Sequence, residues 1–290
     1  MTLLDILEHT PLLLIFLVTV IGLIVGSFLN VVIYRLPLMM QRQWRNECLQ
    51  FLSQPADPAI QERFNLFLPL SRCPHCQTGI KPYQNIPVLS YLLLKGRCAS
   101  CSVAISIRYP IIEALTGILS AMVALNLGFS AALPWALVLT WSLIALSFID
   151  LDSQLLPDSI TQPLLWLGLF LSVFTIFASP DSSIIGTISG YLSLWTVYQV
   201  FKLTTGKEGM GYGDFKLLAL LGAWLGWQFL PLIILLSSCV GAVVGLAMII
   251  FAKHDHQIPI PFGPYLAAAG WIALIWGGKL NALYLGFVGI

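Results

Sequence analysis

The sequence predicts an all-α polytopic membrane protein with about eight transmembrane helices. Two observations carry this prediction. Apolar residues make up 58% of the 290 residues and charged residues only 9%, whereas about a quarter of a soluble domain is charged. Long uncharged runs also recur along the chain, and a spanning helix needs about 20 apolar residues. This composition excludes intrinsic disorder, a collagen-like fibre and a soluble disulfide scaffold.

The spans are placed on the uncharged runs in chain order. The first covers Pro11–Tyr34. Ala114–Ile149 is too long for one helix and breaks between Asn126 and Pro134, which predicts helices at about 110–127 and 133–149. Leu217–Phe251 is also of double length and is expected to turn near Trp227–Pro231. The remaining spans are Ser159–Ala178, Ile184–Phe201 and a last segment that follows Pro261 and ends near Gly278.

The charges indicate how the chain is oriented. Nine of the fourteen Lys and Arg residues, but only three acids, lie between Arg35 and Tyr109. This segment has no dense basic run, so a cytoplasmic loop is favoured over a nucleic-acid-binding one. The N-terminus then lies outside, and Met1–Thr10 lacks the basic region of a cleaved signal peptide. Four lysines outside the loop also fall at cytoplasmic ends: Lys202, Lys207, Lys216 and Lys253.

Four of the six cysteines form two CxxC pairs, Cys73/Cys76 and Cys98/Cys101, separated by 21 residues. Two such pairs suit a tetrahedral zinc site, and a cytoplasmic location keeps the thiols reduced. An iron site and redox-active pairs are the alternatives. Four thiolates close the coordination shell, so a zinc ion here is predicted to be structural. His75 is expected to be a loop residue without a ligand role, and Cys48 and Cys239 are assigned no role.

These patterns together predict the domain organisation. Residues 1–34 form the first transmembrane helix, with a GxxxG at Gly22 and Gly26 that permits close helix packing. Residues 35–109 form a small zinc-binding cytoplasmic domain between spans 1 and 2. Residues 110–290 form a transmembrane bundle.

Two aspartates lie where a carboxylate is costly. Asp150 ends the third span, and Asp214 follows the glycine-rich run Gly209–Gly213 that leads into the sixth. Both are expected at the cytoplasmic boundary, on different helices that packing can bring together. Two neighbouring carboxylates cannot both ionise readily, so one holds a proton while the other acts as a base. Such a pair can activate water for attack on an amide and protonate the leaving nitrogen.

Structural roles remain open at this point. Asp152 and Asp158 fit juxtamembrane or helix-capping positions, and Asp214 fits an N-cap. Two functions from other classes also remain. A membrane transporter with a carboxylate proton relay would need midplane acids and an internal repeat, and neither is visible. A non-catalytic assembly scaffold would need no aspartate pair at all.

Several motifs occur in a fixed order along nearly the whole chain: Gly26–Val32 with Arg35-Leu36-Pro37, the two cysteine pairs, Asn85-Ile86-Pro87, Phe148-Ile149-Asp150, Gly209–Lys216 and Pro261–Tyr265. Together they resemble the type IV prepilin peptidases, also called leader peptidase/N-methyltransferases, of the GxGD intramembrane aspartyl protease group. The GxGD motif alone is weak evidence. Its combination with the Phe-Ile-Asp motif and the paired cysteines is specific.

The resemblance implies cleavage of the basic leader of type IV prepilins and pseudopilins, after a glycine, at the cytoplasmic face of a bacterial inner membrane. It assigns catalysis to Asp150 and Asp214 and leaves Asp152 and Asp158 supporting roles at most. The acid Glu208 is expected either to attract the basic leader or to be a solvated charge.

The long cysteine-bearing loop implies a second activity, methylation of the new N-terminal amine with S-adenosylmethionine as methyl donor. The resemblance also implies zinc at the four cysteines. Because the sequence has no glycine-rich Rossmann fingerprint, the residues that bind the donor stay unidentified. The cytoplasmic loop beside the first span is their expected location.

Overall fold

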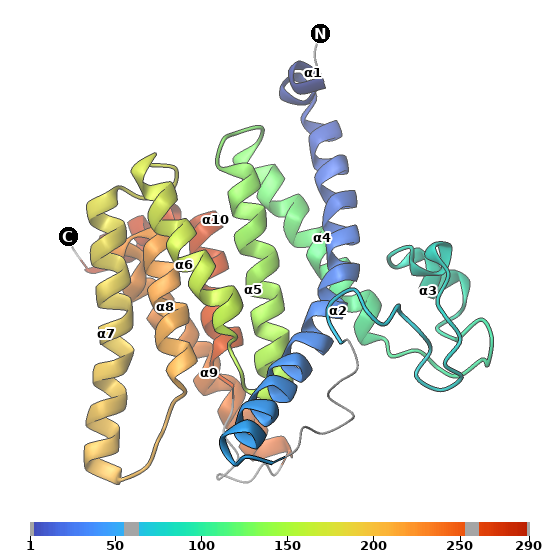
Figure 1. Ribbon diagram of the computed structural model, residues 1–290. Coiled ribbons are helices and arrows are strands. Elements are labelled where there is room, and N and C mark those ends of the chain that lie inside the picture. Colours follow the sequence, from blue (N-terminus) through green and yellow to red (C-terminus); the bar gives the residue numbers. More distant parts are fainter. Residues whose placement is uncertain (1–2, 55–63, 253–260, 289–290) are drawn as a thin grey trace. The chain divides into compact units, whose positions relative to one another are not determined.

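A computed structural model describes residues 3–54, 64–252 and 261–288 of the chain (Figure 1). Within these ranges the fold is all-helical, since the β pairing there is confined to two isolated bridges, Arg72–Gly79 and Arg97–Ala104. The predicted all-α class is therefore confirmed. The contacts within the chain define two compact units, Met1–Leu133 and Pro134–Ile290, and each is described by itself.

The first unit is built on two long helices, α2 and α4, which lie side by side (Figure 1). A Cβ on Gly22 would lie 2.5 Å from Oγ of Ser120, and one on Gly26 would lie 2.8 Å from Cα of Glu113. The GxxxG therefore serves close helix packing, as expected. The helices of this unit are α1 (Leu3–His9), α2 (Pro11–Phe51), η2 (Pro82–Asn85), α3 (Leu89–Leu93) and α4 (Arg108–Leu127).

Helix α2 extends well beyond the predicted span Pro11–Tyr34. It continues through Pro37 to Phe51 and has 41 residues. Proline removes one backbone hydrogen bond, but most of the residues that follow are good helix formers such as Met, Gln, Arg and Leu. The charge of Arg35 marks the end of the apolar stretch and not the end of the helix.

The second unit is a helical bundle in which α8 is the most buried element. Helix α8 packs against α6, α7 and α10 (Figure 1), and eleven of its 14 residues are buried. Helix α7 comes close to it at Gly190, where a Cβ would lie 2.7 Å from the carbonyl oxygen of Leu218. The helices are α5 (Leu133–Ser153), α6 (Asp158–Val173), α7 (Pro180–Thr205), α8 (Tyr212–Leu225), η3 (Trp227–Phe229), α9 (Leu230–Ala252) and α10 (Gly263–Val288).

The long uncharged runs divide where the sequence predicts. A gap separates α4 and α5, and α8 ends before Gly226, whose φ of 86° only glycine adopts readily. The short helix η3 then forms the expected turn. The last helix differs from the prediction, because it continues past Gly278 and through Lys279.

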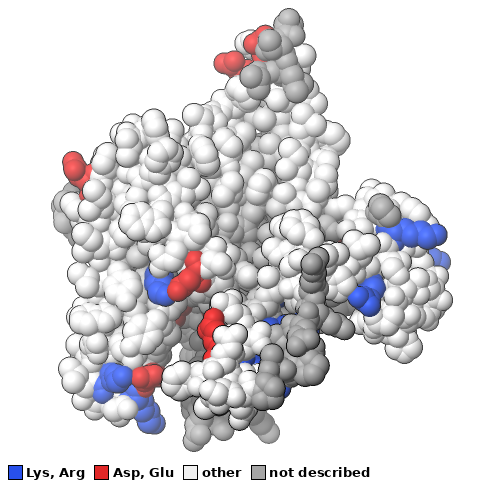
Figure 2. Space-filling view, in the orientation of Figure 1, with Lys and Arg blue, Asp and Glu red and all other residues white. Residues whose placement is uncertain are grey.

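The surface fits a lipid environment. Large apolar side chains are exposed on several helices, among them Phe16, Ile24, Trp166, Phe170 and Val243. Figure 2 shows that charged side chains are sparse on the face in view. In water such a surface would drive aggregation, whereas in a bilayer it contacts acyl chains.

Four helical segments of the described residues are long and apolar enough to cross a membrane: Pro11–Phe51, Arg108–Leu127, Leu133–Ser153 and Trp227–Ala247. The protein is therefore a membrane protein. All eight expected runs are helical, but the 14 residues of α8 reach only about 21 Å at 1.5 Å per residue, less than the hydrocarbon core of about 30 Å. The number of eight spans stays a prediction.

Candidate functional site

Asp150 lies near the C-terminal end of α5 and is held by the start of α10. Its side chain is buried, with 5% of the residue exposed, and its Oδ2 accepts a hydrogen bond of 3.0 Å from the N–H of Gly263. That N–H belongs to the first turn of α10, where backbone donors have no partner within the helix. The helix terminus thus supplies a donor and a favourable dipole to the carboxylate.

The glycine at position 263 is required by this contact. A Cβ at that position would lie 2.6 Å from Oδ2 of Asp150 and would displace it. Gly263 belongs to the Pro261–Tyr265 motif, in which no role could be assigned to it from the sequence. The expected helix start after Pro261 indicates free backbone donors at this place. It does not identify the acceptor, because Asp150 lies 113 positions away in the chain.

Asp214 lies in the first turn of α8 and is 7% exposed. The N-cap of α8 is Gly211, without a side-chain capping bond, and the N–H of Asp214 donates to the Gly211 carbonyl over 3.3 Å. Asp214 is therefore not the N-cap, which removes one structural role that the sequence left open. Its carboxylate is buried within the bundle without a counter-ion that the described residues show.

The two aspartates come from helices that meet around one side chain, Leu156 of the connection between α5 and α6. A Cβ on Gly213 would lie 2.8 Å from Cβ of Leu156, and a Cβ on Gly263 would lie 3.3 Å from its Cδ1. The charge of Asp150 acts on Asp214 across this arrangement. The structure thus brings the two predicted carboxylates close enough for their charges to interact, in a site that is largely shielded from solvent.

The other two acids of this region lie outside the pair. Asp152 is exposed at the end of α5. Asp158 begins α6, and both its oxygens accept hydrogen bonds of 2.8 Å from Nζ of Lys216. Since Lys216 lies two positions after Asp214, this ion pair attaches the start of α8 to the start of α6.

A second ion pair holds the loop that precedes Asp214. Nζ of Lys202, at the end of α7, lies 2.8 Å from Oε1 of Glu208 and donates to the hydroxyl of Tyr198 over 3.3 Å. The hydrogen bond from Lys202 lowers the pKa of Glu208 below its ordinary value. Glu208 is thus paired with Lys202. This ion pair does not decide between the two expected roles of Glu208, which are to attract the basic leader or to be a solvated charge.

An aromatic cluster fixes the rotation of α8 at the same place. Tyr198 of α7 packs against Tyr212 and Phe215, with ring centroids 5.5 and 5.6 Å away. Tyr212 and Phe215 are neighbours on α8, and they flank Asp214 in the sequence. Because Tyr198 and Phe215 are almost fully buried, the aromatic contacts limit how far the first turn of α8 can rotate.

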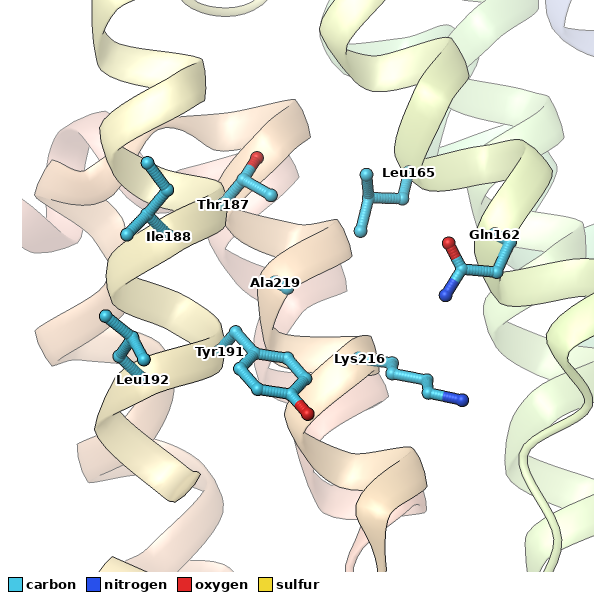
Figure 3. Close-up of a pocket in the computed structure, with 8 residues that line it drawn as sticks. All are labelled: Gln162, Leu165, Thr187, Ile188, Tyr191, Leu192, Lys216 and Ala219. Atoms are coloured by element: carbon cyan, nitrogen blue, oxygen red, sulfur yellow. The ribbon is translucent and has the colours of Figure 1, made fainter. Parts of the chain in front are cut away.

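A groove of about 380 Å³ lies beside this region, between α6, α7 and α8. Figure 3 shows Gln162 and Leu165 on one side and Thr187, Ile188, Tyr191 and Leu192 on the other, with Lys216 and Ala219 between them. Its walls are mainly apolar, and its cation, Lys216, already pairs with Asp158.

The four predicted cysteine ligands gather at one point in the first unit. The sulfurs of Cys73, Cys76, Cys98 and Cys101 all lie within 4.8 Å of one another, and His75 is not among them. Cys48 and Cys239 are exposed and free. The Cys73 and Cys101 sulfurs are 3.8 Å apart, close to the sulfur separation of about 3.8 Å in a tetrahedral zinc site with Zn–S bonds of about 2.3 Å. The donor set therefore fits zinc.

The two cysteine pairs have the same backbone design. In each, the N–H of the first cysteine donates to the carbonyl five residues on, and its carbonyl accepts from the N–H four residues on. Gln77 and Ser102 take matching left-handed conformations, with φ of 58° and 57°. Hydrogen bonds with Thr78, mainly with its side chain and then with its backbone, lower the pKa of Cys76 to about 6. Two local turns thus present thiols to one metal position.

Buried polar residues attach the segments after α2 to the helices of the first unit. Arg35 donates to the carbonyls of Asn65 over 2.9 Å and Pro69 over 2.6 Å. Glu113 of α4 is 8% exposed and accepts a hydrogen bond of 2.8 Å from the N–H of Val88. Glu113 was not among the predicted site residues, although an acid inside a predicted span is a general sign of a functional or structural role.

Comparison with known proteins matches both units. A family model for the bacterial peptidase A24 N-terminal domain matches residues 20–127, and one for the type IV leader peptidase family matches residues 137–246. No solved structure gives a significant match.

Curated relatives named prepilin leader peptidase/N-methyltransferase match along nearly the whole chain. The relative from Stutzerimonas stutzeri is 56% identical over 287 residues and covers 99% of each chain. That from Pseudomonas aeruginosa is 54% identical, over 100% of this chain and 99% of the relative. A relative from Legionella pneumophila is 46% identical, over 94% and 96%. With both halves matched and this identity over its full length, the chain belongs to the type IV leader peptidase family.

Proposed function

We propose that the protein is a bifunctional membrane enzyme. It cleaves the basic leader of type IV prepilins and pseudopilins, and it methylates the new N-terminal amine with S-adenosylmethionine. The observation that supports cleavage most directly is that Asp150 and Asp214, at the end of α5 and the start of α8, are both buried and close enough for their charges to interact. The names of the relatives supply the two activities, prepilin leader peptidase and N-methyltransferase.

Asp150 and Asp214 act as an aspartic protease pair that shares one proton. The unprotonated carboxylate takes a proton from water, and the water oxygen attacks the carbonyl carbon of the scissile amide. The protonated carboxyl gives its proton to the leaving nitrogen, and the C–N bond breaks. The products are a leader with a free carboxylate and a mature chain with a free amine. Gly263 can only donate, so Oδ2 of Asp150 stays an acceptor and keeps a fixed orientation.

The substrate reaches this pair within the membrane. The apolar helix of a prepilin stays in the bilayer and docks on the bundle, which orients the cut site. The basic leader stays on the cytoplasmic side under the same charge rule that places the Arg35–Tyr109 segment there. The proposed location is therefore a bacterial inner membrane, with eight spans, an outside N-terminus and the site at the cytoplasmic face.

The cysteine cluster is proposed to hold a structural zinc ion through Cys73, Cys76, Cys98 and Cys101. Four thiolates leave no coordination position for a substrate or water. The ion stabilises a segment between residues 64 and 107 that has little regular structure and few buried apolar side chains among its described residues.

Asp150→Asn and Asp214→Asn, made separately, test the peptidase. Each isosteric change removes the shared proton, so cleavage of a purified prepilin is expected to fall by at least about a thousandfold. Normal detergent-solubilised elution would show that each variant folds. A scaffold would tolerate both changes in pilin assembly, and a proton-coupled transporter would leave cleavage unaffected. Wild-type rates in either variant would refute the proposed pair.

A further inference from the structure

A second groove, on the first unit, carries a different chemistry from the one beside α8. It has a volume of about 460 Å³, which is in the range of sites for drug-sized ligands. Most of its lining comes from the C-terminal part of α2, the part that the sequence analysis did not expect to be helical. The residues that matter here are Arg42, Gln43, Asn46, Glu47, Gln50 and Phe64.

The groove has a defined floor and wall. Positions 39, 43, 46 and 50 recur at helical spacing, so they share one face of α2. Phe64 forms the opposite side, and its ring lies under the guanidinium of Arg42 at 4.2 Å. The chain just after Phe64 is fixed to α2, because Arg35 donates to the carbonyls of Asn65 and Pro69. The two sides of the groove are therefore held at a set separation.

The side chains in the groove match the parts of S-adenosylmethionine. This molecule carries a carboxylate, an ammonium group, a sulfonium and an adenine ring. Arg42 offers a planar donor for a carboxylate, and Glu47, oriented by a 2.9 Å hydrogen bond from Gln43, offers a negative charge to the two cationic groups. The amides of Asn46 and Gln50 suit the N6/N7 edge of adenine.

We propose that this groove on α2 binds S-adenosylmethionine for the methyltransferase activity. The inference rests on the proposed function, since it needs a methyl donor, and it supplies the residues that the sequence left unidentified. The groove beside α8 does not suit this ligand, because its walls are apolar and Lys216 is already paired. The basic leader of a prepilin does not suit the α2 groove, because it would meet the guanidinium of Arg42.

Direct binding tests the proposal without relying on turnover. The full-length protein in detergent is titrated with S-adenosylmethionine, and separately with S-adenosylhomocysteine, by calorimetry. Arg42→Gln and Glu47→Gln are each expected to weaken S-adenosylmethionine binding by about tenfold or more, the effect of losing one charge-assisted contact. Because the sulfonium is absent from S-adenosylhomocysteine, Glu47→Gln is expected to affect that ligand less.

Arg45→Gln is the matched control, because Arg45 lies on the same helix but does not line the groove. Wild-type affinity in this control, together with weakened binding in the two groove variants, supports the site. Unchanged binding in the groove variants overturns it, and so does an equal loss in the control. Prepilin cleavage by the wild-type protein is measured separately, so a failure of the proposed peptidase function is distinguished from a failure of the donor site.

Discussion

The hydrogen bond between Gly263 and Asp150 is the most restrictive single contact of the site. It fixes one carboxylate oxygen of the proposed pair with a backbone donor that no side-chain substitution can remove directly. The lack of a Cβ at Gly263 is what allows the approach, since any other residue would place a carbon 2.6 Å from that oxygen.

Gly263→Ala is therefore expected to displace Asp150 while leaving the bundle folded. A shift of the carboxylate by roughly 1 Å lowers kcat for leader cleavage by about 100-fold, with a smaller change in KM. Steady-state kinetics on a purified prepilin measures both constants. Gly278→Ala is the control, because a Cβ there meets nothing within 4 Å. A wild-type kcat in Gly263→Ala would contradict the positioning role.

At the scale of elements, α8 is oriented by contacts on several sides. The ion pairs Lys202–Glu208 and Lys216–Asp158 attach its N-terminal region to α7 and α6. Tyr198 packs on its first turn from α7. The position of Asp214 thus depends on residues of α6, α7 and the loop before α8, outside the proposed pair.

Glu208→Gln is expected to loosen the loop before Asp214 and to lower kcat by about two- to fivefold, the scale of an exposed ion pair. The charge-swapped variant Lys202→Glu with Glu208→Lys restores the rate if the pair itself matters. Lys207→Gln, a neighbouring change outside the pair, should have no effect. Failure of the swap to restore any activity would indicate that the loop does not depend on this pair.

The same pair predicts a pH dependence of stability. Lys202 lowers the pKa of Glu208 in the folded protein, so its contribution is present above the ordinary carboxylate pKa and is lost as the pH falls through the lowered value. The difference in Tm between the wild type and Glu208→Gln should therefore vanish in acid. A difference that persists well below the carboxylate range would point to another cause.

The sequence predicted where the long helices lie more accurately than where they end. Uncharged runs located the eight long helices of the described residues, α2 and α4 to α10, because a charge inside lipid is costly. They did not locate the end of α2, since helix formers continue after Pro37 whether or not lipid surrounds them. The contact of Gly263 with Asp150 could not be predicted from the sequence either, because it depends on how helices that are distant in the chain pack together. The cysteine cluster could be read, because each CxxC pair is a local turn.

For the whole molecule, the division into two units predicts that metal loss acts locally. Cys73→Ser removes the most buried of the four thiols and should reduce bound zinc well below one ion per chain. Limited proteolysis should then cut the segment between α2 and α4 first, while helices α5 to α10 stay protected. Cys48→Ser is the control, because Cys48 is exposed and outside the cluster. Intact zinc content in Cys73→Ser would count against coordination by four thiolates.

The backbone N–H of Gly263, which donates a hydrogen bond to Asp150, is synthesised long after Asp150 itself. The ribosome incorporates Asp150 113 residues before Gly263, the first residue of α10. Nascent chains generally fold from the N-terminal end. A chain synthesised only as far as α9 accordingly lacks one hydrogen bond that orients the proposed catalytic pair. We therefore expect efficient leader cleavage only after Gly263 has been synthesised and has packed against Asp150.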